Sequence, residues 1–318
     1  MRYNRLGKAG IKVSELSLGT WITFGGKLDF NKARECVKVA FEAGVNFFDT
    51  AEIYSHGVAE SILGKIAKEY PREELVISTK IFWGGDKPNQ TGLSRKHLIE
   101  GTKASLKQLK MDYIDLLFCH RPDPATPIEE TVMAMDNIVR QGLAFYWGTS
   151  EWSANDIEAA IKFAHEYKLI LPSMEQPEYN MFSRKKVEQE YTPLYEKYGI
   201  GITTWSPLAS GILTGKYVNG LPAGSRLERV NWLRSEFEKC DLLTEETMAK
   251  VKQLAEIAQE IAATLPQLAL AWCLKNPHVS TVIIGASSVE QLKENLQAAE
   301  IKNKLSQQIL AKIATIIK

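Results

Sequence analysis

The most restrictive feature of this sequence is a near-regular recurrence of short β-branched and aromatic runs, separated by helix-like segments. Successive runs begin about 30 residues apart, as in the repeating βα unit of a barrel, except for a longer last interval. These units predict an α/β fold, a (β/α)8 TIM barrel, in which the surplus residues form insertions and extra helices near the C-terminus. The expected strands are residues 16–19, 45–48, 76–79, 113–118, 144–148, 173–176, 202–206 and 281–284.

The N-terminal segment differs from the repeating units. Residues 1–13 contain Gly7 and Gly10 between short polar and apolar stretches, which predicts a β-hairpin able to plug the bottom of the barrel. No low-complexity tract or flexible linker divides the chain, so residues 1–318 are interpreted as a single domain.

Two helix starts have a recognisable chemical signature. Residues 126–129 read Thr-Pro-Ile-Glu, a capping box with proline at the first helical position. Ser288 and Gln291 have the same spacing, so both are expected at the start of the last long helix.

Composition excludes several classes of function. The chain has 39 Lys and Arg against 38 Asp and Glu, a formal net charge of +1, so no basic surplus attracts nucleic acid or an anionic membrane. No apolar run approaches the roughly 20 residues that span a bilayer, and no secretory signal is present, which predicts a cytoplasmic protein without membrane insertion. The widely spaced Cys36, Cys119, Cys240 and Cys273 predict reduced thiols and no metal site.

Four polar side chains follow consecutive predicted strands, at the end where such a barrel builds its active site. Asp49 and Tyr54 follow the second strand, Lys80 ends the third and His120 ends the fourth. An adjacent ammonium favours phenolate, so Lys80 is expected to lower the pKa of Tyr54 toward that of a usable general acid. Asp49 would keep the lysine charged, and His120 would polarise a carbonyl oxygen.

Each of these residues also has an ordinary structural interpretation. Taken singly, Asp49 can be a turn cap, Tyr54 a rim tyrosine, Lys80 a strand-end cation and His120 a loop histidine. Their joint occurrence at one end of successive strands favours the functional interpretation over coincidence.

The sequence contains neither a G-x-G-x-x-G motif after the first strand nor a Walker A motif, so a phosphate site must lie elsewhere. TIM barrels hold phosphates with the loops after their last two strands and a helix N-terminus. Here the corresponding loops, 205–211 and 285–288, contain small residues, and Lys216 and Arg226 add positive charge. The two cations fit an extra phosphate on an adenosine ribose, although each can equally be a solvated loop cation.

Several motifs occur in a fixed order along the chain. They are Asp49-Thr50-Ala51-Glu52-x-Tyr54, Ser78-Thr79-Lys80, the strand end at His120, Gly148-Thr149-Ser150 and Trp205-Ser206-Pro207-Leu208. Together they resemble the aldo-keto reductase superfamily. More narrowly, residues 19–26, 80–85, 121–124, 144–150 and 266–273 resemble the branch that contains the voltage-gated potassium channel β subunits.

This resemblance implies an enzyme that uses NADP(H) to reduce small-molecule aldehydes and ketones, with Tyr54 as proton donor and Asp49, Lys80 and His120 completing a catalytic tetrad. It also implies that Trp205 stacks on the nicotinamide. Trp21 and Trp83 are candidates for an aromatic substrate wall, although either can simply pack. The residues implied in cofactor binding are Thr20, Trp21, Asp49, Ser150, Gln176, Trp205, Ser206, Pro207, Leu208, Ser210, Gly211, Lys216, Arg226, Gly285, Ser287, Gln291, Glu294 and Asn295.

Three departures refine the resemblance. Animal channel subunits have asparagine where His120 stands, so histidine here favours turnover. Glu151 occupies a position where the wider superfamily usually presents an amide, and a glutamate would accept from the nicotinamide carboxamide without donating back. The long N-terminal extension by which some channel subunits act on pores is not seen, so pore inactivation is not expected.

The channel branch also suggests an alternative function. The resemblance implies a homotetramer and a redox-sensing accessory subunit, which would bind the cytoplasmic domain of a potassium channel and turn over slowly. Fast aldehyde reduction by the isolated protein would favour the enzyme, and co-purification with a channel domain would favour the accessory subunit.

Overall fold

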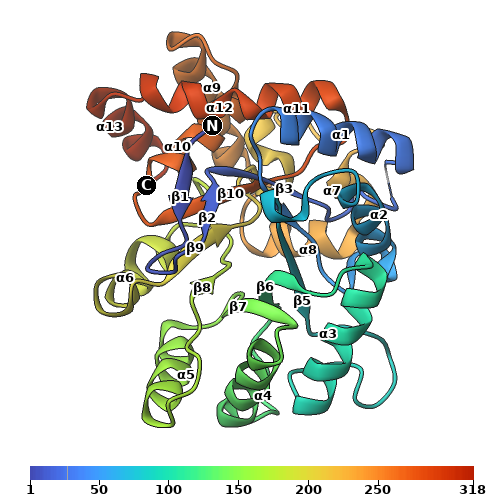
Figure 1. Cartoon of the computed structure of the whole chain (residues 1–318). Helices are drawn as coiled ribbons and strands as arrows, with labels where there is room; N and C mark the ends of the chain where they lie inside the picture. Colours follow the sequence, from blue (N-terminus) through green and yellow to red (C-terminus); the bar gives the residue numbers. More distant parts are fainter. Residues whose placement is uncertain (27) are drawn as a thin grey trace.

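The computed structural model describes residues 1–26 and 28–318. Within them, parallel strands close into a barrel of eight in the order β10-β3-β4-β5-β6-β7-β8-β9, ringed by helices (Figure 1). The predicted (β/α)8 TIM barrel is therefore confirmed. The barrel strands are β3 (Leu16–Gly19), β4 (Phe47–Asp49), β5 (Val76–Ile81), β6 (Ile114–Cys119), β7 (Ala144–Thr149), β8 (Met174–Glu175), β9 (Gly201–Thr204) and β10 (Val279–Ile284).

The helices form the outer layer. The long interval between β9 and β10 contains α7 to α10, and α11 to α13 follow the last strand, as predicted for the surplus residues. The helices are α1 (Phe30–Glu42), α2 (Val58–Ala67), α3 (Arg95–Leu109), α4 (Ile128–Arg140), α5 (Ala154–Glu166), α6 (Thr192–Tyr198), α7 (Arg226–Arg229), α8 (Asn231–Lys239), α9 (Glu245–Glu260), α10 (Leu265–Lys275), α11 (Val289–Leu296), α12 (Ala298–Ile301) and α13 (Gln307–Ile316).

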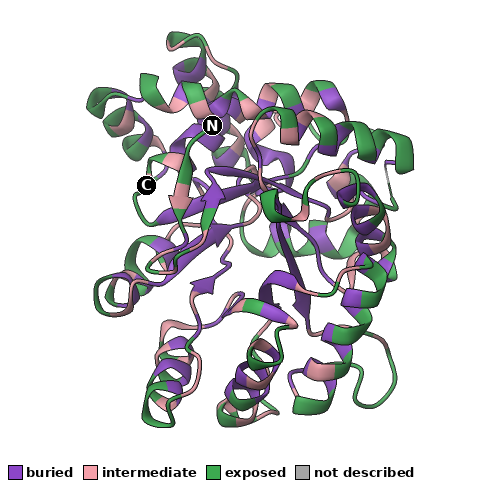
Figure 2. Cartoon of the chain, viewed as in Figure 1, coloured by how far each residue is buried: buried purple, intermediate pink, exposed green. Residues whose placement is uncertain are grey.

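Buried residues make up most of the strands and the inward faces of the helices, whereas residues on the outward helix faces are exposed (Figure 2). On α3, Leu98, Thr102 and Leu109 are completely buried and Leu106 nearly so, at the three- and four-residue spacing of one helix face. Burying each leucine stabilises the fold by roughly 1.5–3 kcal/mol, so this face fixes the helix against the barrel.

The hairpin at the N-terminus consists of β1 (Tyr3–Arg5) paired antiparallel with β2 (Lys12–Ser14). Leu6 and Val13 are completely buried and cluster with Phe47 and Val76, which lie at the starts of β4 and β5. Gly7 has a φ of 58°, and a side chain there would lie 2.2 Å from the Gly199 carbonyl oxygen. The hairpin therefore plugs the bottom of the barrel, as predicted.

Some strand and helix ends differ from the prediction. Strand β9 ends at Thr204 rather than at residue 206, because Ser206 adopts a left-handed backbone with a φ of 54°. Helix α4 has no side-chain cap, and the predicted capping box is wrong because the Thr126 hydroxyl donates to Asp123 at 2.7 Å instead. The Ser288 cap is confirmed, since its hydroxyl oxygen accepts from the Gln291 amide at 3.3 Å.

The cysteines are free, and only Cys240 is exposed. Among the described residues, no single helix is long and apolar enough to cross a membrane; only α9 and α10 together, bent by 87°, reach that length and composition. The same residues contain no cluster of His, Cys, Asp and Glu able to hold a metal ion.

Glu175 makes fold stability sensitive to pH. Its carboxyl group is completely buried on β8, where it accepts from the Tyr191 hydroxyl at 3.2 Å and from Thr149. Burial raises the pKa of Glu175 from 4.5 to about 8. The folded protein therefore holds a proton that the unfolded chain releases. This contribution to the free energy of unfolding is complete below about pH 4.5 and is lost as pH rises through about 8.

We expect the loss from Glu175 to be on the order of 4 kcal/mol. Urea denaturation at pH 5 and pH 8.5 measures it, and Glu175→Gln, a neutral isostere, should remove most of the difference. Burial also raises the pKa of Glu60 to about 7, so a smaller dependence should persist in the variant. An identical pH dependence in both proteins would contradict the assignment.

Candidate active site

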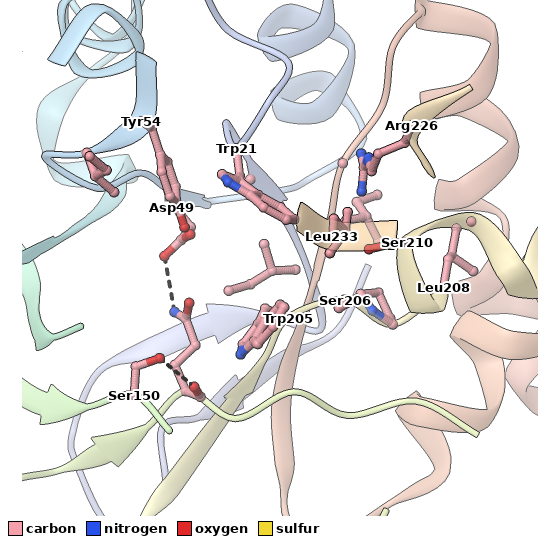
Figure 3. Close-up of a pocket in the computed structure, with 18 of the residues that line it drawn as sticks. Trp21, Asp49, Tyr54, Ser150, Trp205, Ser206, Leu208, Ser210, Arg226 and Leu233 are labelled. Carbon is pink, nitrogen blue, oxygen red and sulfur yellow. Dashed lines mark hydrogen bonds between the residues drawn. The ribbon is translucent and has the colours of Figure 1, made fainter. Parts of the chain in front are cut away.

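A cavity of about 710 Å³ opens at the carboxyl ends of the barrel strands. Figure 3 shows Tyr54 and Asp49 at one side of it and Arg226 and Leu208 at the other, with aromatic side chains between them. One end of the cavity is therefore lined by the predicted catalytic residues Asp49 and Tyr54, and the other end, here called the cationic end, is lined by Lys216 and Arg226. The lining residues that the sequence predicted are Trp21, Asp49, Tyr54, Trp83, His120, Ser150, Gln176, Trp205, Ser206, Pro207, Leu208, Ser210, Gly211, Lys216, Arg226, Gly285 and Gln291.

Barrel geometry brings the four predicted catalytic residues together. Asp49 is the last residue of β4, and Lys80 lies near the end of β5 with its side chain completely buried. Tyr54 begins a single turn of 3-10 helix, Tyr54–Gly57, and His120 directly follows β6. Because parallel strands end at the same rim, residues separated by up to about 70 positions meet at one site.

The Lys80 ammonium is the centre of this group. It donates to Asp49 Oδ2 at 2.6 Å, to the Thr50 carbonyl at 2.7 Å and to the Tyr54 hydroxyl oxygen at 3.2 Å. These bonds use all three ammonium protons. The other carboxylate oxygen, Asp49 Oδ1, accepts from Ser78 at 2.7 Å and from Gln176 at 3.1 Å, so the ion pair is rigidly held.

The electrostatics differ in part from the prediction. Burial opposes a charge on Lys80, but the Asp49 carboxylate and the Tyr54 phenol outweigh it and raise the lysine pKa, so the ammonium persists. Burial also raises the pKa of Tyr54, and the neighbouring ammonium only partly offsets that rise. The expected lowering of the tyrosine pKa is therefore wrong in sign. The phenol is instead held protonated, with a cation in place to stabilise its phenolate.

His120 is neutral in this site. Burial, and then the positive charges of Lys80 and Arg121, lower its pKa well below the ordinary value. Its ring lies edge-on to Tyr54 and Trp83, with centroids at 5.9 and 5.0 Å. His120 Nδ1 is buried without a hydrogen-bond partner in the described part of the chain, which leaves polar capacity unused beside the phenol.

The cationic end is formed by the loop after β9 and the insertion that follows. Ala209, Ser210 and Gly211 have φ values of 45°, 50° and 103°, a run of left-handed backbone that can turn amide groups toward an anion. Lys216 and Arg226 line the cavity here, and neither has an ion-pair partner within residues 1–26 and 28–318. Burial lowers the pKa of both, and each cation is therefore poorly compensated.

A second cavity of about 390 Å³ adjoins this end and shares Lys216 and Gln291 with the first. Glu294 and Asn295 line it rather than the main cavity. Asn295 Nδ2 is buried there without a partner among the described residues. An unpaired amide facing a cavity indicates a site prepared for a polar group.

Three other predicted residues lie outside the lining of the main cavity. Lys80 lies beneath the cavity and is hydrogen-bonded to two residues that line it, Asp49 and Tyr54. Thr20 is buried, and its hydroxyl donates to the Asp49 carbonyl at 3.2 Å. Ser287 is exposed and donates its amide to Gln291 Oε1 at 2.8 Å.

Glu151 does not present its carboxylate to the cavity, contrary to the expectation from the sequence. Its Oε1 accepts from the Trp205 indole at 3.0 Å and from the Glu178 amide at 2.5 Å, and Oε2 pairs with Lys186 at 2.8 Å. The residue therefore fixes the orientation of Trp205 from behind.

Sequence reasoning missed several lining residues. Arg121 follows His120 directly, so its position after a strand was a usable signal. Trp232 and Leu233 belong to α8, inside the long insertion, and no spacing pattern relates them to the barrel ends. Ile53 and Thr214 also line the cavity.

Comparison with known families agrees with this geometry. The model of the Aldo/keto reductase family matches residues 15–318, which include all eight barrel strands. The chain belongs to the aldo/keto reductase family. Oxidoreduction is accordingly its general chemistry, and the resemblance predicted from the ordered motifs is confirmed.

Two plant relatives of this aldo/keto reductase align over its full length. A protein of Arabidopsis thaliana named "Probable voltage-gated potassium channel subunit beta" is 52% identical over 320 residues, covering 100% of this chain and 97% of the relative. A protein of Oryza sativa subsp. japonica with the same name is 49% identical, with the same coverage. The likeness to the channel β-subunit branch is confirmed.

Proposed function

We propose that this protein reduces aldehydes and ketones to alcohols with NADPH. The observation that supports it most directly is the Lys80 ammonium, which bonds Asp49 and the Tyr54 hydroxyl together at the floor of the cavity, 2.6 and 3.2 Å away. A protonated phenol beside a buried cation and a neutral histidine suits proton donation to a carbonyl oxygen.

The residues present fit a dinucleotide with three phosphates. Its nicotinamide would lie against Trp205 near Ser150 and Gln176, and its phosphates against the loop 206–211 and Lys216. Arg226 would bind the phosphate on the adenosine ribose, and the unpaired Asn295 amide nitrogen would donate a hydrogen bond to the adenosine end. When bound, the reduced nicotinamide supplies a hydride to the carbonyl carbon.

The chain's own residues would supply the proton that the carbonyl oxygen needs. As the new C–H bond forms, the electron pair of the C=O bond moves to oxygen, and Tyr54 gives that oxygen its proton, so the phenolic O–H bond breaks. The Lys80 ammonium stabilises the resulting phenolate, Asp49 keeps the ammonium charged, and the phenolate then takes a proton from water. His120 donates to or orients the carbonyl oxygen, and the products are the alcohol and the oxidised cofactor.

The direct test follows cofactor consumption by the purified protein. NADPH and NADH are offered separately with aromatic aldehydes, short aliphatic aldehydes, ketones and methylglyoxal. We expect steady oxidation of NADPH that depends on the carbonyl compound, with NADH much less effective. No carbonyl-dependent oxidation of either cofactor would overturn the proposal.

Glu151 provides a further prediction for this function. Glu151→Ala should free the Trp205 indole and raise the Kd for NADPH by about tenfold, the usual effect of losing one charge-assisted hydrogen bond. Fluorescence titration with NADPH measures the change. Glu166→Ala, on the exposed end of α5, is the matched control; equal affinity in the Glu151 variant and the control would contradict this role.

A second candidate function comes from the names of the plant relatives. As an accessory subunit, the protein would form a homotetramer on the cytoplasmic domain of a potassium channel, and slow reduction would report redox state. Co-purification with such a domain, a tetrameric mass and turnover too slow to sustain metabolism would favour it over a metabolic reductase. A cytoplasmic location agrees with both functions and remains a prediction.

A further inference from the structure

We infer that the preferred substrates are carbonyl compounds with a carboxylate group, and that Arg121 binds this carboxylate. The inference rests on the proposed function and narrows it to a substrate class. Arg121 lines the main cavity, where its guanidinium contacts His120 and Ser150.

The Arg121 guanidinium is fixed in place but not neutralised. One of its nitrogens, Nη1, donates to the His120 carbonyl at 2.6 Å and to the Ser150 hydroxyl oxygen at 3.3 Å. No ion pair in the described part of the chain includes this arginine. Its remaining N–H groups are therefore available, and a guanidinium edge matches the two oxygens of a carboxylate.

A neighbouring acidic residue, Glu178, does not form an ion pair with Arg121. The positive charge of Arg121 acts to lower the pKa of Glu178, but the hydrogen bond of this carboxyl group is accepted from the Asn180 amide, at 3.1 Å, and not from Arg121. Burial, with the neighbouring Glu151 carboxylate, raises the pKa of Glu178 to about 7, so a large fraction of it is protonated at neutral pH.

The surroundings favour a flat, singly charged group. The guanidinium carbon lies 5.5 Å from the Trp83 ring centroid and 5.7 Å from that of Trp205, so aromatic walls flank it on two sides. Such walls exclude water and strengthen charge pairing. One uncompensated cation matches one carboxylate, whereas a dianionic phosphate would leave a charge unpaired. The cation also lies close enough to Tyr54 and His120 to influence both of their pKa values.

The test compares 2-, 3- and 4-carboxybenzaldehyde with the corresponding carbamoylbenzaldehydes, neutral compounds of nearly the same shape. For the ring isomer that spans the distance to Arg121, kcat/KM for the carboxylate should exceed that for the amide. In Arg121→Met, the carboxylate-to-amide ratio should fall by about 10- to 100-fold, and Arg121→Lys should lie between the two. Arg95→Met, at the exposed start of α3, is the control and should keep the wild-type ratio.

The carboxylate-to-amide ratio separates substrate recognition from a general loss of activity. Weaker cofactor binding or a displaced Ser150 would lower kcat/KM for both substrates together and leave the ratio unchanged. An unchanged ratio in Arg121→Met would overturn the inference, as would a wild-type protein that shows no carboxylate preference with any isomer. If neutral aldehydes are reduced without discrimination, the proposed reductase function stands and only this inference fails.

A second measurement needs neither turnover nor a folded variant. Calorimetric titration of the wild-type protein with NADP⁺ present should show benzoate binding at least about tenfold more tightly than benzamide. Equal affinities would overturn the carboxylate site, even if the protein reduced no aldehyde at all.

Discussion

Replacing Tyr54 with phenylalanine is expected to lower kcat for aldehyde reduction by about 100- to 10,000-fold, the usual range for loss of a general acid. The cause is specific: Tyr54→Phe removes the proton that the proposed general acid transfers to the carbonyl oxygen, and it leaves the Lys80–Asp49 ion pair in place. The Kd for NADPH should change little, since the phenol is remote from the cationic end (Figure 3). Steady-state kinetics and fluorescence titration of the same preparation measure both quantities.

Tyr146→Phe is the matched control for that variant. Tyr146 is a half-buried tyrosine on β7 that packs against the hairpin cluster at the opposite end of the barrel. It loses the same hydroxyl and should keep wild-type kinetics. If Tyr54→Phe reduced aldehydes as fast as this control, Tyr54 would not be the proton donor.

Removing the two cations of the insertion should abolish discrimination between cofactors. In a Lys216→Met, Arg226→Met double variant, the ratio of the Kd for NADH to that for NADPH should fall by about 10- to 100-fold. The reason is that only NADPH has the extra phosphate that these two cavity-lining cations, which have no ion-pair partner within the described residues, would bind. Fluorescence titration with each dinucleotide measures the ratio.

The control for the cations is an Arg95→Met, Lys107→Met double variant on the exposed face of α3. It removes the same formal charge far from the cavity, so it should reproduce the wild-type ratio at matched ionic strength. A ratio that stays unchanged in the Lys216 and Arg226 variant would show that neither cation distinguishes the phosphate. The cofactor preference would then have to come from other residues.

Much of the fold could be predicted because it depends on local, repeated patterns. A barrel strand that is buried on both faces reads as a short, mainly apolar run, so strands such as β6 and β10 stand out in the sequence. Strand ends are harder to locate, since the left-handed backbone at Ser206 depends on tertiary contacts rather than on the residue type. The capping box predicted at Thr126 is wrong for a similar reason, because Asp123, three residues earlier, binds the Thr126 hydroxyl.

The candidate site could be predicted only where chemistry coincides with a strand end. Asp49, Lys80 and His120 satisfy that condition, and the structure brings them together with Tyr54. The sign of the Tyr54 pKa shift could not be predicted, because it depends on how deeply the phenol is buried. Glu151 was misjudged because its carboxylate turns toward Trp205 and Lys186, a direction that sequence does not specify.

A crystal structure of the protein with both NADP⁺ and a carbonyl compound bound is the most direct test of the proposed mechanism. We expect the nicotinamide ring on Trp205, its reactive carbon within about 3–4 Å of a carbonyl group that is hydrogen-bonded to Tyr54, and the adenosine end near Asn295. A dinucleotide bound in the reverse direction, or with its nicotinamide outside the cavity that Tyr54 and His120 line, would contradict it.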